Sequence, residues 1–148
     1  MSDTSQPPRK ILEVHRTLVE SPEPRTRVTR ARKPADYPHV PQAQLDVARR
    51  LSNPVIMGPP LCDELIALVR HVFTEEEADI ARYLRTLRGK TAEQVARAAH
   101  RPVDEVRPIL VRLGTEKRAI AATGPDERRL HRLAPLVPGM FEMILIGQ

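Results

Sequence analysis

Two helix starts of the same design follow one another in this chain, and they constrain its fold more than any other feature. Thr74 is followed three positions later by Glu77, and Thr91 by Gln94. In such a capping box, the Thr side chain and the Glu or Gln side chain each bind a backbone N–H that the first turn of a helix leaves unpaired. The sequence therefore predicts helices that begin at Thr74 and at Thr91, with Phe73 packing against the first of them from the staple position.

The apolar residues after each start give the extent of the helices. Ile80, Leu84 and Leu87 fall at helical spacing, so they predict one buried face that continues until Gly89 ends the first helix. The second helix runs to His100, and a short turn at residues 100–102 follows it. A third helix is predicted over 103–113, because its apolar residues recur at spacings of three and four.

Residues 117–122 and 129–135 have the pattern of two short strands, joined by the loop TGPDER. Three helices can bury an aliphatic core, and a hairpin can cover its edge. The predicted fold class is therefore mainly α with a small β-hairpin: a winged helix-turn-helix with a three-helix core and a two-stranded wing.

Proline divides the chain into two parts. Ten of the fifteen prolines precede Leu61, and the apolar residues that could build a core are concentrated after it. We expect a disordered, basic, Pro-rich tail over 1–40, a short helix with a Pro-rich linker over 41–60, and the winged-helix-like domain over 61–148. Within the tail, the spacing of a short amphipathic helix is found at Ile11, Leu12, His15, Leu18 and Val19.

The net charge of +5 lies mostly outside the predicted domain. Residues 1–40 hold eight Lys and Arg against five Asp and Glu, whereas residues 41–148 hold sixteen against fourteen. A domain dedicated to DNA usually presents a face of one sign. The charge distribution is therefore weak support for a nucleic-acid partner.

DNA recognition nevertheless remains an alternative function. The helix over 103–113 would enter the major groove, where Asp104 and Glu105 would meet phosphates and Pro108 would interrupt the helical hydrogen bonds. Basic side chains on this helix and on the hairpin are the candidate nucleic-acid contacts: Arg107, Arg112, Lys117, Arg118, Arg128, Arg129 and Arg132.

The residues that catalysis or metal binding would need are missing from the pattern. Cys62 is the one cysteine, so the chain cannot supply the thiolates of a zinc or iron–sulfur site, and it has no glycine-rich phosphate loop. The histidines are not spaced as ligands. We expect no enzyme and no resident cofactor. With no signal peptide and no run of roughly 18 apolar residues, we expect a cytoplasmic protein without a membrane partner.

The stretch from Pro138 to Gly147 is unusually apolar. Its large side chains would pack on the helices or connect to another protein segment. The candidate interaction residues are Met140, Phe141, Met143 and Ile144.

Three stretches, MGPPLCDELIALVRHVFTEEEADIARYL, KTAEQVARAAHRPVDEVRPILVRLGTEKRAIA and LAPLVPGMFEMILIG, resemble the N-terminal winged-helix-like region of bacterial 4Fe-4S ferredoxin-type proteins. The resemblance covers roughly residues 51–147, and the FTEEEA and PGMFE motifs are its most specific parts. It implies a non-enzymatic accessory or interaction domain in a redox system.

The sequence given ends at Gln148 without a cysteine-rich motif. A 4Fe-4S cluster is therefore expected only if a downstream segment or a partner chain supplies such a motif. The expected partner is another protein or a missing C-terminal cluster domain. The alternative is an ArsR-like or MarR-like DNA-binding regulator. Such proteins would match only the middle one of the three stretches.

Overall fold

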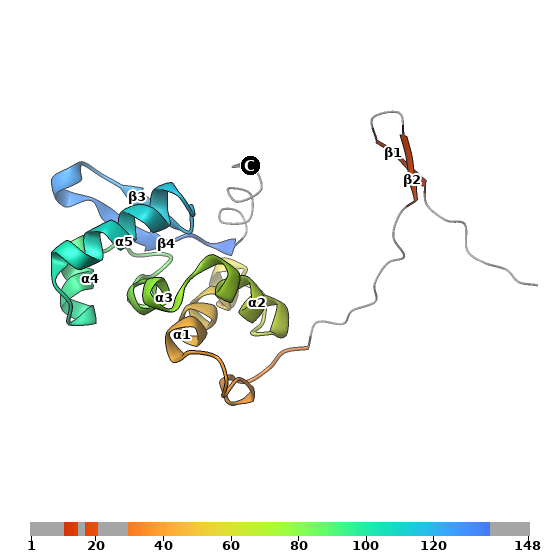
Figure 1. Ribbon diagram of the computed structural model, residues 1–148, viewed down its shortest axis with the longest axis horizontal. Helices are drawn as coiled ribbons and strands as arrows, with labels where there is room; N and C mark the ends of the chain where they lie inside the picture. Colours follow the sequence, from red (N-terminus) through yellow and green to blue (C-terminus); the bar gives the residue numbers. More distant parts are fainter. Residues whose placement is uncertain (1–10, 15–16, 21–29, 137–148) are drawn as a thin grey trace, which may run out of the picture.

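The computed structural model describes residues 11–14, 17–20 and 30–136. In these ranges the protein is mainly helical, with five α-helices and two antiparallel two-stranded sheets (Figure 1). The helices are α1 (Gln42–Leu51), α2 (Asp63–Val72), α3 (Glu75–Ala81), α4 (Ala92–Ala99) and α5 (Val103–Thr115). The strands are β1 (Ile11–Val14), β2 (Thr17–Glu20), β3 (Ile120–Thr123) and β4 (Leu130–Leu133). Three short 3-10 helices are η1 (Pro34–Asp36), η2 (Pro54–Ile56) and η3 (Asp126–Arg128).

The first helix, α1, belongs to the same core as the helices that follow it. Its apolar face, which includes Leu45, Ala48 and Leu51, is buried, and α1 packs against both α2 and α3. Tyr37 is also buried, and its hydroxyl donates a hydrogen bond of 2.8 Å to Asp63 Oδ1 in α2. Residues that the sequence interpretation assigned to the tail and the linker thus contribute to the core.

Both capping boxes are present, as predicted. Thr74 Oγ1 accepts from the backbone N–H of Glu77 at 3.2 Å, and Glu77 Oε2 accepts from the N–H of Thr74 at 2.9 Å. Thr91 and Gln94 form the same pair of bonds, at 3.3 and 3.0 Å. These bonds satisfy N–H groups that the first turns of α3 and α4 leave unpaired.

The helix predicted to run from Thr74 to Gly89 is much shorter. It ends at Ala81, and the next N–H groups bond three residues back, from Tyr83 to Ile80 and from Leu84 to Ala81. Such bonds tighten the chain into turns. Leu84 is buried as predicted, but the prediction for Leu87 is wrong, because its side chain is 70% exposed.

The early end of α3 lets the chain reach the hairpin. Lys90 forms an isolated antiparallel bridge with His131, through backbone bonds of 2.9 and 2.7 Å. Next to it, a Cβ on Gly89 would lie 2.7 Å from Leu130 Cβ, so a larger residue would push this segment away from β4. Gly89 therefore permits a close approach to β4 and does not end a helix.

A tight turn at His100 joins α4 to α5. His100 has a left-handed backbone with φ of 54°, and the N–H of Arg101 bonds to the Ala96 carbonyl at 3.0 Å. Glycine is the usual residue in this position, because a Cβ is disfavoured there. The predicted third helix is present as α5, which continues through the exposed Pro108.

The amphipathic helix expected in the tail is not formed, because residues 11–14 and 17–20 pair as an antiparallel hairpin. In its register Ile11 faces Glu20 and Val14 faces Thr17. Four β-branched residues, Ile11, Val14, Thr17 and Val19, favour strands over a helix. Helical spacing alone did not distinguish the two structures.

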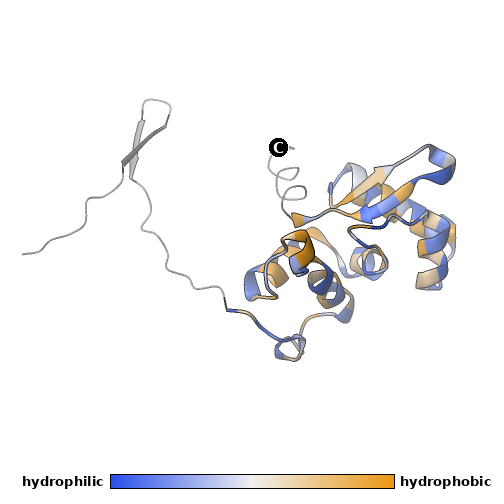
Figure 2. Ribbon diagram, turned by 180° about the vertical axis from the view of Figure 1, so that it is seen from behind, coloured by the Kyte–Doolittle hydropathy of each residue, from blue (hydrophilic) through white to orange (hydrophobic). Residues whose placement is uncertain are grey.

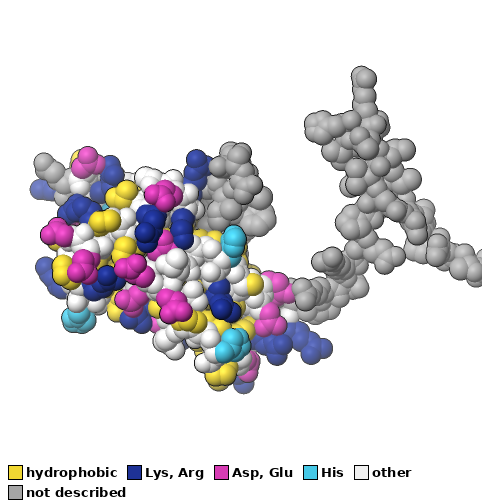
Figure 3. Space-filling view, viewed as in Figure 1, with side chains coloured by type: hydrophobic (Ala, Val, Ile, Leu, Met, Phe, Trp, Pro, Cys, Tyr) yellow, Lys and Arg dark blue, Asp and Glu magenta, His cyan; other side chains and the backbone are white. Residues whose placement is uncertain are grey.

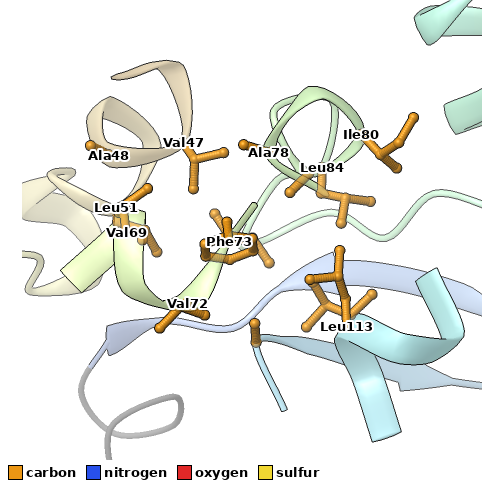
Figure 4. Close-up of a cluster of buried hydrophobic side chains, with 14 of the residues drawn as sticks. Val47, Ala48, Leu51, Val69, Val72, Phe73, Ala78, Ile80, Leu84 and Leu113 are labelled. Atoms are coloured by element: carbon orange, nitrogen blue, oxygen red, sulfur yellow. The ribbon is translucent and has the colours of Figure 1, made fainter. Parts of the chain in front are cut away.

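The core lies where the inner faces of the helices meet. Figure 2 shows hydrophobic positions alternating with hydrophilic ones along the helices, as expected for helices that are buried on one side. Phe73 is fully buried and lies among side chains from α1, α3 and α5, including Val47, Ala78 and Leu113 (Figure 4). The connector between α2 and α3 thus supplies a fully buried aromatic residue to a mainly aliphatic core.

Candidate interaction surfaces

A buried carboxylate connects the start of α3 with the end of α5. Glu77 is 1% exposed, and its two oxygens accept from Arg112 Nε at 2.8 Å and from Lys117 Nζ at 2.6 Å. Lys117 Nζ also donates to the Val72 carbonyl at 2.8 Å. Two of the predicted nucleic-acid contacts, Arg112 and Lys117, are therefore held against α2 and α3 by structural bonds.

The hydrogen bonds to Glu77 keep it charged. Burial alone would raise the pKa of Glu77, because a carboxylate loses its hydration inside a protein. The bonds from Lys117, from the Thr74 backbone and from Arg112 outweigh burial, so the pKa lies below its ordinary value. One residue thus serves both as the helix cap and as the counter-ion of two cations.

Charged side chains near the N-terminal end of α5 also form ion pairs within the chain. Arg107 Nη2 pairs with Glu93 of α4 at 2.8 Å, and both side chains are about half exposed. Glu105 pairs with Arg101 at 3.1 Å, and Arg101 also approaches Glu76 at 3.4 Å. Acidic and basic side chains are interleaved over the face of the molecule in Figure 3. This face does not present a continuous basic surface to a phosphate backbone.

The hairpin of β3 and β4 exposes more of its basic side chains than α5 does. Arg129 pairs with Asp126 at its tip, whereas Arg128 and Arg132 are exposed and have no ion pair with a residue of the described ranges. Arg118 is exposed and has a left-handed backbone with φ of 52°. Among the predicted contacts, the exposed arginines of the hairpin, Arg128 and Arg132, remain the ones best placed for an external partner.

His131 lies among the hairpin residues that the sequence suggests could touch phosphates, but the structure buries it. It is 6% exposed, and its Nδ1 has no hydrogen-bond partner among the described residues. Burial lowers the pKa of His131, and the nearby Arg129 and Arg107 lower it further. Side chains alternate between the two faces of a strand, so His131 shares the buried face of β4 with Leu133. This alternation was the sequence signal for its burial.

Sequence reasoning also missed a cluster of arginines around a hollow between two loops. Arg49 and Arg50 come from the last turn of α1, and Arg85 and Arg88 come from the segment after α3. They line a cavity of about 630 Å³. The paired arginines at the end of α1 were visible in the sequence, but the fold was needed to bring Arg85 and Arg88 beside them.

The predicted interaction residues Met140, Phe141, Met143 and Ile144 lie outside the described residues. In the part of the chain that the structure describes, no three His, Cys, Asp or Glu side chains gather as metal ligands. Cys62, the one cysteine of the sequence, is buried, and burial raises the pKa of its thiol. The described side chains therefore do not supply the thiolate ligands of a 4Fe-4S cluster.

No helix among residues 30–136 has the length and apolar character to cross a membrane.

No protein-family model, curated protein or solved structure matches the chain at a significant level.

Proposed function

We propose that the winged-helix-like domain expected over 61–148 is a non-enzymatic interaction domain, and that it acts as an accessory domain in a redox system without holding a cluster itself. The element order supports the fold: α3, the bridging Lys90, α4, α5, then β3 and β4. The Lys90 bridge adds a third strand position to the hairpin, at the place between the first two helices of such a domain.

One observation carries the choice of protein docking over DNA recognition. Basic residues of α5 and its C-terminal turn are neutralised within the chain, by Glu77 for Arg112 and Lys117 and by Glu93 for Arg107. DNA affinity depends on cations that neutralise phosphates and release counter-ions. A helix whose arginines already bind carboxylates is poorly equipped for that task.

Binding of the purified chain to a pool of fluorescent genomic fragments tests the choice. The proposal expects no sequence-selective binding at about 150 mM salt, where non-specific phosphate contacts are weakened. A parallel pull-down should recover a redox protein or a cluster-binding protein. Selective DNA binding that survives this salt concentration, with no such partner recovered, would overturn the proposal.

A DNA-binding regulator is the second candidate, and the exposed hairpin favours it. Arg128 and Arg132 lack acidic partners in the described ranges and lie where wings touch phosphates. If this function holds, changing either to Ala reduces the salt slope of DNA binding by about one unit. Arg97→Ala, on the exposed face of α4, is the matched control.

A further inference from the structure

The arginine pocket has defined walls. The end of α1 forms one side, η2 with Pro54 and Ile56 forms another, and the segment 85–88 closes the third. Its volume of about 630 Å³ lies within the usual range for small-molecule sites. We define these residues as the arginine pocket.

The lining of the pocket is positively charged and contains no acidic side chain. Its charge comes from four arginines, Arg49, Arg50, Arg85 and Arg88. Within residues 30–136 none of the four forms an ion pair, and Arg50 Nε is buried without a hydrogen-bond acceptor.

Neighbouring groups relieve this charge only in part. Asp46 is the acidic residue that acts on Arg50, but it already pairs with Arg82 at 3.5 Å. Burial and then Arg85 lower the pKa of Arg50, and Lys90 experiences the same two arginines. Arg50 is half-buried, whereas Arg49, Arg85 and Arg88 are exposed, so solvent screens part of their repulsion and a bound anion would relieve the rest.

The wall formed by η2 is held in place by local bonds. Asn53 Oδ1 accepts from the N–H of Val55 at 3.0 Å, and the N–H of Gly58 bonds to the Asn53 carbonyl at 3.0 Å. A Cβ on Gly58 would lie 1.9 Å from the Leu51 carbonyl, so this loop fits closely against the end of α1. The cavity is therefore formed before any ligand arrives.

We propose that the arginine pocket binds a compact polyanion that carries a di- or triphosphate group. Guanidinium groups match phosphoryl oxygens with paired, charge-assisted hydrogen bonds. Four of them around one hollow require an anion of high charge density, and a single carboxylate would leave most of the charge uncompensated. The four arginines are not among the residues whose ion pairs support the proposed function.

Two sources of such a group fit the pocket. A free polyphosphate would use the arginines alone, whereas a nucleotide would also contact the apolar side chains Ile56 and Leu87 of the lining. Asn53 and Thr86 supply neutral hydrogen-bonding groups to the same pocket. The four arginines line one hollow, which favours a compact ligand over a nucleic-acid strand.

Titration calorimetry of the full chain tests the proposal, with inorganic phosphate, pyrophosphate, tripolyphosphate and ATP as probes in buffer without magnesium. We expect saturable one-to-one binding of tripolyphosphate or ATP at about 150 mM salt, where exposed charges are screened. Arg50→Gln and Arg85→Gln should each weaken it by about tenfold, as expected for losing one charge-assisted contact. Arg97→Gln, outside the pocket, should bind as the wild type does.

Leu87→Ser separates the two sources: weaker binding of ATP alone indicates a nucleotide, and unchanged binding of both probes indicates polyphosphate. Leu87 is exposed, so this variant is expected to fold, and circular dichroism checks all four variants. Three results would overturn the proposal: no saturable binding, equal loss in Arg97→Gln, or a single-stranded oligonucleotide that binds the same arginines more tightly than every phosphate probe.

Discussion

Glu77 and Lys117 lie forty positions apart in the sequence, and the carboxylate oxygen of one accepts a 2.6 Å hydrogen bond from the ammonium of the other. Glu77 comes from the first turn of α3, and Lys117 follows α5. Because Glu77 is buried, this ion pair and the one with Arg112 are less screened than pairs at the surface. They connect the start of α3 to the segment that enters the hairpin.

Removing the charge of Glu77 should destabilise the fold. Glu77→Gln keeps an oxygen for the capping box, as Gln94 shows in α4, but loses the charged acceptor of both cations. We expect the free energy of unfolding to fall by about 2 kcal/mol, the typical value for a hydrogen bond to a charged group. Urea denaturation measures it. Glu76→Gln, at the exposed neighbour, should change the free energy by at most about 0.5 kcal/mol.

The contribution of Glu77 should depend on pH in one direction. Its folded pKa lies below the ordinary value, so its stabilisation is complete above the unfolded pKa of about 4.3. That stabilisation is lost as the pH falls through the folded pKa. The gap in stability between wild type and Glu77→Gln should therefore close below about pH 4. A gap that stays constant from neutral to acid pH would contradict the role of this carboxylate.

His131 should make the protein less stable at mildly acidic pH. Its folded pKa lies below the ordinary value, so the folded state binds the proton less readily than the unfolded state. The stabilisation is present above about pH 6.5 and decreases as the pH falls from there toward the folded pKa. Thermal unfolding between pH 7.5 and 5 should show this decrease in the wild type and a flatter profile in His131→Gln. The exposed His71→Gln is the control and should keep the wild-type profile.

Leu84 and Leu87 should differ sharply on truncation. Leu84→Ala removes a fully buried side chain, and we expect a loss of about 3 kcal/mol in the free energy of unfolding. Leu87→Ala, at a side chain that is 70% exposed, should change it by less than about 0.5 kcal/mol. Chemical denaturation of the two variants tests the early end of α3. Equal losses would mean that the helix continues past Ala81.

His100 offers a stabilising substitution. Its backbone is left-handed, which costs a residue with a Cβ about 1 kcal/mol or more, whereas glycine adopts it freely. His100→Gly should raise the free energy of unfolding by about 0.5–1 kcal/mol after the larger entropy of the unfolded chain is counted. Ala99→Gly, one residue earlier and inside α4, should lower it by about 1 kcal/mol. Thermal unfolding measures both changes, and midpoint temperatures that shift in the same direction for the two variants would contradict the turn geometry.

Local chemistry made part of the fold predictable. The capping boxes at Thr74 and Thr91 use residues three positions apart, so the sequence contains the whole interaction. The apolar spacing of α5 likewise predicted its buried face. The end of α3 was not predictable in this way, because it depends on the pairing of Lys90 with a residue far along the chain. Periodicity alone extended the helix to Leu87.

The candidate sites show the same limit. Sequence reasoning identified Arg112 and Lys117 as basic but assigned them to nucleic-acid contacts, because the buried carboxylate that binds them is distant in sequence. The arginine pocket requires α1 and the segment after α3 to lie side by side, which no local pattern records. Charge type is readable from a sequence, whereas the partner of each charge depends on the fold.

The bridge between Lys90 and His131 also bears on how the chain folds. It closes a long loop that contains α4, α5 and β3. The contacts between α4 and α5 are local, so this helix pair should form early, whereas the bridge requires the entropy of closing the long loop to be overcome first. Weakening the bridge should therefore accelerate unfolding more than it slows refolding, and the helix pair should act as the folding nucleus.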